Sequence, residues 1–431
     1  MKKFRKWICV LLSALMVLGL ASCSGGGTSE AAPPEGAASG AASGEATTGG
    51  PSINVILPGN IEGQLIKDSI PDFESETGIT VNVTEVPVDT LNTKITVELE
   101  SGGSTADVVA YPYEWIPKFA DSLLALDGYI SEEDKNDIAQ YAWDSASYNG
   151  SILGQMYVVT GMIMFYRSDL LEDAGLEVPT TWDEYVSVSQ ALTTDDMYGT
   201  VVTAKLAEEP VGMYLNYLYQ NGGDILDEEG NVILNNEAGV EAMQFMVDLV
   251  YEYQVAPEAA STFTTTESLN LFTEEQVALC PNWSYVWSVS QADDSPIKDK
   301  VGMALLPENK EAGISLGGWV MSAVGASQNP DAAYQFIQFM NDTERQVRMA
   351  VEGGNTPTRT SALEAAEVKE IPLFDVMSEA LATSVPRSKY PKYDEISNEI
   401  AIALSGSLAQ TGEPQELLDT AAANIEAILA S

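Results

Sequence analysis

The residues best suited to contact a ligand lie in segment 272–287, FTEEQVALCPNWSYVW, where three large aromatic rings follow a short apolar run. Trp283, Tyr285 and Trp287 alternate, so they would share one face of a strand, whereas a helix would spread them over separate faces. Rings in a cleft stack on flat, partly apolar ligands. The alternative is a buried corner of the core, and the pattern alone leaves both open.

The residue types disfavour catalysis. Histidine is absent from all 431 residues, which removes the commonest general base and the usual zinc ligand. Ser315 in GISLG fits a nucleophile elbow, but no imidazole exists to activate it, so we interpret the match as chance. We expect no enzyme, no cofactor and no metal. The catalytic alternative is a glycoside hydrolase that uses Glu62 and Glu114 as acid and nucleophile.

The charge balance narrows the possible partners. The chain has 64 acidic and 20 basic residues, a formal net charge of -44. Such a field repels nucleic acid and anionic membrane surfaces, so neither is expected as a partner. We expect a monomer that binds a small molecule.

The first residues indicate export and lipid attachment. Residues 1–22 combine a basic start with an apolar run that is too short to span a bilayer, as in a signal peptide. The motif LASC, ending at Cys23, resembles a bacterial lipobox, in which the cysteine takes a lipid. An ordinary signal peptide with a chance cysteine is the alternative. Residues 23–52 are rich in Gly, Ala and Ser and predict a disordered linker that tethers a domain outside the cytoplasmic membrane.

The next elements predict the fold class. Strands at 53–57, 79–86 and 107–110 alternate with helices at 63–77 and 91–101, which is typical of a parallel, right-handed α/β lobe. A chain of this length suggests a second lobe. Ligands gather where parallel strands end, so Tyr111, directly after the third strand, is a candidate contact. Cys280 lies alone in an apolar run, which indicates an inert core thiol.

Short motifs then occur in a fixed order between residues 53 and 429: FESETGI at 73–79, ADVV at 106–109, YRSDLL at 166–171, TWDE at 181–184, LGGW at 316–319, NPDAAYQF at 329–336 and PTR at 357–359. In this order, and with segment 272–287, they resemble the extracellular solute-binding proteins of ABC importers. The similarity is to the carbohydrate type, which includes maltose- and trehalose/maltose-binding lipoproteins.

The resemblance implies a fold of two α/β lobes joined by three crossings, with solute bound between them. It implies that a hinge closes the two lobes over the solute, which is then delivered to a membrane permease. Hinge closure of this kind is general for periplasmic binding proteins. We place the crossings near residues 161–165, 277–282 and 320–324. The expected N-terminal lobe comprises 53–160 and 283–319, and the C-terminal lobe comprises 161–282 and 320–431.

The resemblance also implies a set of solute contacts on both sides of the cleft. With Tyr111, these are Glu62, Trp283, Tyr285, Gly318, Trp319, Arg387 and Tyr393, with Tyr390 as the alternative tyrosine.

Two departures from the family pattern bear on which solute binds. Pro112 stands where the family usually has an acid, and residues 159–161 lack a second one. Carboxylates accept hydrogen bonds from sugar hydroxyls, so their loss weakens the case for a maltose-like ligand. We expect a sugar, and an oligosaccharide in particular, with a non-carbohydrate solute as the alternative.

Overall fold

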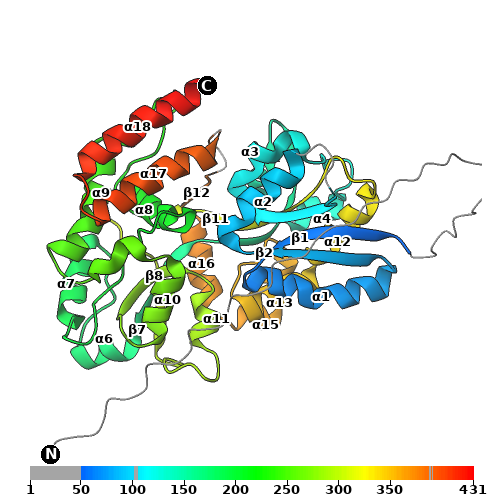
Figure 1. The fold of residues 1–431 in the computed structure, drawn as a ribbon. Helices are drawn as coiled ribbons and strands as arrows, with labels where there is room; N and C mark the ends of the chain where they lie inside the picture. Colours follow the sequence, from blue (N-terminus) through cyan, green and yellow to red (C-terminus); the bar gives the residue numbers. More distant parts are fainter. Residues whose placement is uncertain (1–49, 101–104, 388–389, 391) are drawn as a thin grey trace, which may run out of the picture. The chain divides into compact units, whose positions relative to one another are not determined.

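The computed structural model describes residues 50–100, 105–387, 390 and 392–431 (Figure 1). The expected signal peptide, Cys23 and nearly all of the linker lie outside this part of the chain. Within it, no helix is both long and apolar enough to cross a lipid bilayer.

A mixed sheet with strand order β2-β1-β3-β11-β6 forms the first part of the fold. β1 pairs in parallel with β2 and β3, which confirms the parallel arrangement predicted for residues 53–110. β11 runs antiparallel to both β3 and β6. The strands are β1 (Ser52–Pro58), β2 (Thr80–Val86), β3 (Val108–Pro112), β6 (Gln155–Thr160) and β11 (Gly317–Ala323).

Helices from distant parts of the sequence cover this sheet. Phe73 on α1 (Ile61–Thr77) contacts Phe336 on α12 (Pro330–Met340) edge to face, with ring centroids 5.2 Å apart. Figure 1 shows the blue α1 beside the yellow α12 and the orange α13, and contacts between these helices agree. The accompanying helices are α2 (Val88–Glu100), α3 (Ile116–Phe119), α4 (Glu132–Asp137), α5 (Gln140–Ser145), α13 (Thr343–Gly353) and α14 (Thr360–Leu363).

A second, antiparallel sheet has the order β8-β7-β9. Its strands are β7 (Met162–Arg167), β8 (Leu279–Trp283) and β9 (Val301–Ala304). The chain passes from the first sheet to the second between β6 and β7, at Gly161.

The strand pairing and the helix packing differ from the expected lobe boundaries in three places. β9 lies in the segment assigned to the N-terminal lobe, yet it pairs with β7. α12 and α13, assigned to the C-terminal lobe, pack on the first sheet because Phe336 completes its core. The crossing placed near 320–324 falls within β11, whose ladder with β3 continues to Ala323. The remaining boundaries and the hinge crossings stay predictions.

Helices of the second part surround two buried clusters. In one, Trp182 stacks on Phe245 with ring centroids 4.1 Å apart, and the other contains Phe165 and Phe374. The helices are α6 (Ser168–Ala174), α7 (Trp182–Leu192), α8 (Glu208–Gln220), α9 (Glu237–Tyr251), α10 (Thr265–Thr273), α11 (Val286–Ser290), α15 (Ala366–Lys369), α16 (Leu373–Leu381), α17 (Tyr393–Leu408) and α18 (Pro414–Ala430). Short strands complete the structure: β4 (Ser147–Tyr148) with β5 (Ser151–Ile152), and β10 (Ile314–Ser315) with β12 (Ser384–Val385).

Candidate functional site

The aromatic segment that follows β8 does not stay extended. The strand ends at Trp283, Tyr285 adopts a helical backbone conformation (φ -61°, ψ -19°), and α11 begins at Val286. Trp283, Tyr285 and Trp287 therefore lie on a strand end, a turn and a helix, and they do not share one strand face. The helical alternative holds for the last part of the segment.

Two half-buried indoles come close through β11. A Cβ added to Gly317 would lie 2.6 Å from a ring carbon of Trp283, so only glycine lets this ring rest against the strand. Trp319 follows two residues along the same strand and is also half-buried. Gly318, between them, is buried with its backbone close to the Val158 carbonyl. The predicted contacts Trp283, Gly318 and Trp319 are thus brought together by β8 and β11.

Glu62 occupies the first turn of α1, whose N-terminus is capped by the Asn60 side chain accepting from the Gly63 backbone N–H. Its carboxylate is buried, and burial raises its pKa to about 7. The backbone N–H of Glu62 and the Asn355 amide oppose this rise. Desolvation disfavours the charged form of this carboxylate, and a hydrogen-bond donor brought to it would stabilise that form.

The loop after α13 connects Glu62 with the segment that follows β8. Gly353 lies against Leu65, one turn beyond Glu62, and Gly354 lies against the Ser284 carbonyl and the Tyr285 Cα. The next residues run beside β6, where Thr356 forms a bridge with Val159. This loop therefore touches the first sheet, α1 and the end of β8 at once.

Several buried polar atoms around this loop have no hydrogen-bond partner within the described part of the chain. They include the Tyr157 hydroxyl on β6 and the Thr356 hydroxyl, both on side chains at most 3% exposed. Burial, and then the nearby Glu62 carboxylate, raises the pKa of Tyr157. Native proteins rarely leave such groups unsatisfied, so these atoms are suited to hydrogen bonds with a bound molecule.

Glu209 approaches the same place from the N-terminal turn of α8. Its carboxylate accepts a hydrogen bond from the Thr265 hydroxyl at 3.2 Å, and the Thr265 carbonyl accepts one from the Asn282 amide at 3.0 Å. Burial raises the pKa of Tyr285, and the negative charges of Glu209 and Glu62 add to the rise. Burial raises the pKa of Glu209, and the neighbouring Glu267 and Glu208 carboxylates contribute.

Arg387 stands at the centre of a second charged group. Its guanidinium pairs with Glu114 at 3.1 Å and with Glu208, and its Nε donates to the Leu316 carbonyl at 3.2 Å. Its backbone N–H donates to the Tyr113 hydroxyl at 2.9 Å. Arg387 is 4% exposed, so these partners fully surround it.

The predicted residues therefore separate into three groups. Glu62, Trp283, Tyr285, Gly318 and Trp319 gather around β11 and the loop after α13. Arg387 and Tyr393 lie together, because the Tyr393 hydroxyl donates to Glu208 at 2.9 Å. Tyr111 is fully buried, with its hydroxyl 2.8 Å from the Ser322 hydroxyl and its ring against Phe119, so its placement gives the predicted solute contact no support.

Tyr157, Glu209 and Thr356 were not predicted from the sequence. The adjacent acids Glu208 and Glu209, directly before Pro210, are an ordinary helix start, so their pattern carries no separate signal for binding. Tyr157 lies on a strand that is buried along its whole length. Only the burial of its unpartnered hydroxyl distinguishes it.

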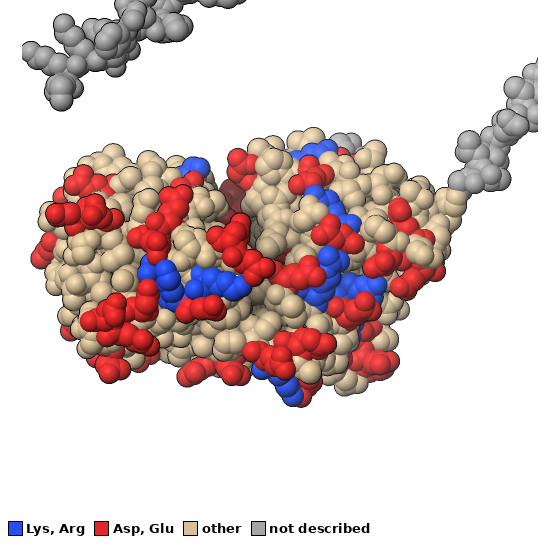
Figure 2. Space-filling model, turned by 90° about the horizontal axis from the view of Figure 1, so that it is seen from below, with Lys and Arg blue, Asp and Glu red and all other residues tan. Residues whose placement is uncertain are grey.

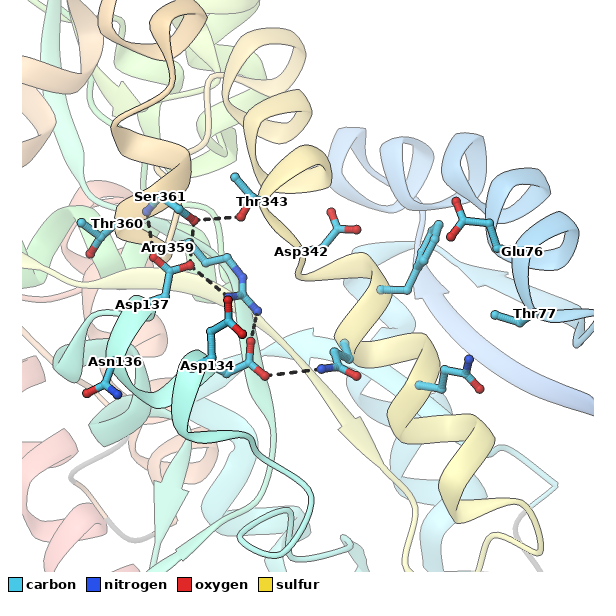
Figure 3. Close-up of a pocket in the computed structure, with 14 residues that line it drawn as sticks. Glu76, Thr77, Asp134, Asn136, Asp137, Asp342, Thr343, Arg359, Thr360 and Ser361 are labelled. Carbon is cyan, nitrogen blue, oxygen red and sulfur yellow. Dashed lines mark hydrogen bonds and ion pairs between the residues drawn. The ribbon is translucent and has the colours of Figure 1, made fainter.

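A separate groove of about 970 Å³ lies on the first part of the fold, between α4, α12 and α14 (Figure 3). Asp134 and Asp137 both pair with Arg359, and the Ser361 hydroxyl donates to Asp137 at 2.7 Å. These contacts satisfy the charged groups internally. None of the predicted site residues lines this groove, so it is not the predicted solute site.

The proposed hydrolase pair also gains no support. Glu114 is occupied by Arg387, and the groups acting on Glu62 are Asn355 and Glu209 rather than Glu114. An acid and a nucleophile that share a glycosidic bond must face one another across it.

Comparisons with known proteins bear on the family and the fold. The family model for the bacterial extracellular solute-binding protein matches residues 58–347. The solved structure of maltose-bound T. maritima MalE3 is 27% identical, covers 88% of this chain and 100% of its own, and superposes with a TM-score of 0.84. This likeness confirms the expected α/β fold of two lobes.

Two curated relatives extend over most of the chain. A probable ABC transporter-binding protein of Deinococcus radiodurans is 24% identical over 364 residues, which are 81% of this chain and 86% of the relative. The arabinooligosaccharide-binding protein of Bacillus subtilis is 25% identical over 305 residues, 68% of this chain and 69% of the relative.

Proposed function

The chain belongs to the family of bacterial extracellular solute-binding proteins, and from this premise we propose that it is the lipid-anchored binding subunit of an ABC importer whose solute is an oligosaccharide. Two similar proteins support the solute class, since one was solved with maltose and another is named for arabinooligosaccharides. The matching family and the similar proteins are solute-binding proteins, which supports a role that is not enzymatic.

The observation that carries the proposal is the combination of rings and acceptors beside β11. Trp283 and Trp319 are half-buried, so each keeps part of its ring accessible. The carboxylates of Glu62 and Glu209 and the hydroxyl of Tyr157 lie around the neighbouring loop. A sugar ring offers an apolar face for stacking and a polar edge for hydrogen bonds, so it matches both features.

The groups come from both sheets, which suits capture by closure. Glu62 and Tyr157 belong to the first sheet and its helices, whereas Glu209 and Trp283 belong to the second. A solute that contacts both sets binds the closed arrangement better than the open one, and this difference in affinity drives closure. The permease of the importer is the proposed partner that reads the closed state.

Anchoring at Cys23 completes the proposal. Cleavage before Cys23 and attachment of a lipid would leave residues 24–52 as a tether, reaching on the order of 30 Å if they behave as a flexible coil. The binding protein would then act on the outer face of the cytoplasmic membrane, where the permease opens.

A thermal-shift screen of residues 24–431 tests the solute class. A ligand that binds only the folded state raises the melting temperature by mass action. We expect a rise with an oligosaccharide and no new product after prolonged incubation. If amino acids but no sugar, polyol or oligosaccharide raise the melting temperature, the carbohydrate proposal is wrong. Mass spectrometry of the protein extracted from membranes tests the lipid on Cys23.

A further inference from the structure

The interior of α8 contains a glycine, Gly212, that the helix itself does not need. Gly212 is buried, and its backbone lies outside the left-handed region that favours glycine. Glycine is less favourable than alanine inside a helix, because it loses more conformational freedom on folding. Its presence here therefore points to a neighbour that leaves little room for a Cβ atom.

That neighbour is the indole of Trp283. A Cβ added to Gly212 would lie 3.2 Å from the ring atom Cζ2 and 3.5 Å from Cη2, and the next nearest atom is the Met162 Cε at 3.9 Å. A Cβ added to Gly317 on β11 would lie 2.6 Å from Cζ3 and 3.1 Å from Cη2 of the same indole. These three carbons form the outer edge of the six-membered ring. Glycine backbones from two different elements therefore lie against one edge of Trp283.

Contacts of Asn216 fix these elements relative to the ring. Asn216 lies one turn after Gly212 on the same face of α8. Its Oδ1 accepts a hydrogen bond at 2.7 Å from the backbone N–H of Ser315, two residues before β11 begins, and its Nδ2 lies 3.1 Å from the Met162 Sδ. Met162 is the residue of β7 that pairs with Trp283. Asn216 is 1% exposed, so it ties α8 to the strands on both sides of the ring without competition from water.

The rest of the indole remains available for a contact. Trp283 is only half-buried, although its outer edge is enclosed. A large side chain at the end of a strand can adopt several rotamers, and ordering it on binding costs free energy. A ring that the fold already holds in one orientation avoids this cost, which is the usual role of residues that support a binding contact.

We propose that Gly212, together with Gly317, is a positioning residue of the solute site, which fixes the plane of the Trp283 ring so that its exposed part stacks on an apolar face of the solute. This role rests on the proposed function, because it requires that Trp283 contacts the solute. A side chain at position 212 would push the ring by a few tenths of an ångström and so change its plane.

Gly212→Ala tests this role, because alanine favours the helix and meets the ring before any other group. Nuclear magnetic resonance of the indole N–H groups in residues 24–431 needs no ligand, and Trp283→Phe identifies the Trp283 signal by its loss. We expect Gly212→Ala to shift or split this signal, to leave the other indole signals in place and not to lower the melting temperature. Gly128→Ala is the matched control, because Gly128 is exposed and its added Cβ would meet nothing within 4 Å.

Calorimetry with maltotriose and with arabinotriose measures the effect on binding. We expect Gly212→Ala to weaken the binding of whichever trisaccharide the unaltered protein binds at least fivefold, and Gly128→Ala to leave it unchanged. Trp283→Phe keeps a ring for stacking but lacks the outer edge that meets the glycines. Addition of Gly212→Ala to Trp283→Phe should therefore change the affinity less than twofold.

The outcomes separate this role from the proposed function. An unmoved Trp283 signal in Gly212→Ala overturns the positioning role, whichever sugar binds. A moved signal with unchanged affinity also overturns it, and so does an equal loss of affinity in the Trp283→Phe background, because the glycine then acts on something other than the ring edge. Failure of both trisaccharides to bind the unaltered protein counts against the proposed function, and the Trp283 signal in Gly212→Ala then decides by itself whether the glycine positions the ring.

Discussion

Two pairs of carboxylates in this protein, each with one buried and one partly exposed member, differ in their counter-charge. Glu114 and Glu208 share the guanidinium of Arg387, whereas the described part of the chain contains no ion pair to Glu62 or Glu209. The Glu114–Glu208 pair has its counter-charge built in. The Glu62–Glu209 pair has no such arginine in the described part of the chain. The comparison separates charge that stabilises the fold from charge that we propose faces a solute.

The charges at the surface differ from these carboxylates in their exposure to water. The surface carries many acidic side chains, with smaller groups of basic ones among them (Figure 2). Charges at the surface are screened by water and salt, so they matter little for stability. Buried charges are not screened, and the presence or absence of one arginine therefore decides their role.

Removing Arg387 should have the largest effect. Arg387→Ala leaves the buried Glu114 and the partly exposed Glu208 without a cation, and loss of one partner of a buried pair costs about 3–5 kcal/mol of unfolding free energy. Urea denaturation measures this loss. Arg348→Ala is the matched control, because Arg348 is a third exposed and pairs with the exposed Asp68 and Glu352; it should cost at most about 1 kcal/mol.

The opposite result would assign Arg387 to the solute site instead of the core. If Arg387→Ala unfolds like the unaltered protein but no longer binds solute, Arg387 is a solute contact, as the family resemblance implied.

The Glu62–Glu209 pair should make stability depend on pH in the opposite sense from an ordinary carboxylate. The pKa of Glu62 is about 7 in the folded state against 4.5 in the unfolded state. The folded chain therefore binds more protons between these values, and Glu62 lowers stability as pH rises from about 4.5 through 7, by about 3 kcal/mol in full.

Glu62→Gln should remove this loss. We expect the variant to be more stable than the unaltered protein at pH 8 and no more stable at pH 4.5, as measured by urea denaturation at both values. Glu76→Gln controls for the loss of an acid from this very acidic chain. A variant that is less stable at pH 8 would mean that Glu62 already has a counter-charge.

The tryptophans should affect the solute rather than the fold. Trp283→Ala and Trp319→Ala each remove a stacking face worth about 1–3 kcal/mol, by analogy with bases stacked on aromatic side chains. Binding should weaken about 5- to 150-fold or disappear, with folding retained. Trp287→Ala, on α11, should bind normally. Equal affinity in all three variants would mean that the rings of Trp283 and Trp319 do not contact the solute.

Much of the fold could be predicted from the sequence because its signals are local. Alternating strands and helices over 53–110 predicted the parallel β1, β2 and β3, and the apolar run around Cys280 predicted a buried thiol, whose pKa burial raises to about 11. The return of α12 and α13 to the first sheet was missed, because the contact of Phe73 with Phe336 joins residues 263 positions apart and has no local pattern.

The site could be predicted in part for the same reason. LGGW and the aromatic segment are local motifs, and the structure brings Trp283 and Trp319 together. The Glu62–Glu209 pair depends on how α1, α8 and the loop after α13 meet, and no spacing in the sequence encodes that meeting. Arg387 was found by resemblance, yet its partners Glu114 and Glu208 come from tertiary contacts alone.

The smallest predicted effect concerns a more exposed version of the Arg387 bridge. Lys118 on α3 pairs with Asp394 on α17 at 2.7 Å, and both side chains are about a quarter exposed. Like Arg387, this contact joins a helix near β3 to the C-terminal helices, but water reaches it. A double-mutant cycle of Lys118→Ala and Asp394→Ala should give a coupling of about 0.2–1 kcal/mol that falls in high salt. A coupling as large as the loss expected for Arg387→Ala, and insensitive to salt, would mean that burial does not explain the difference in strength between the two ion pairs.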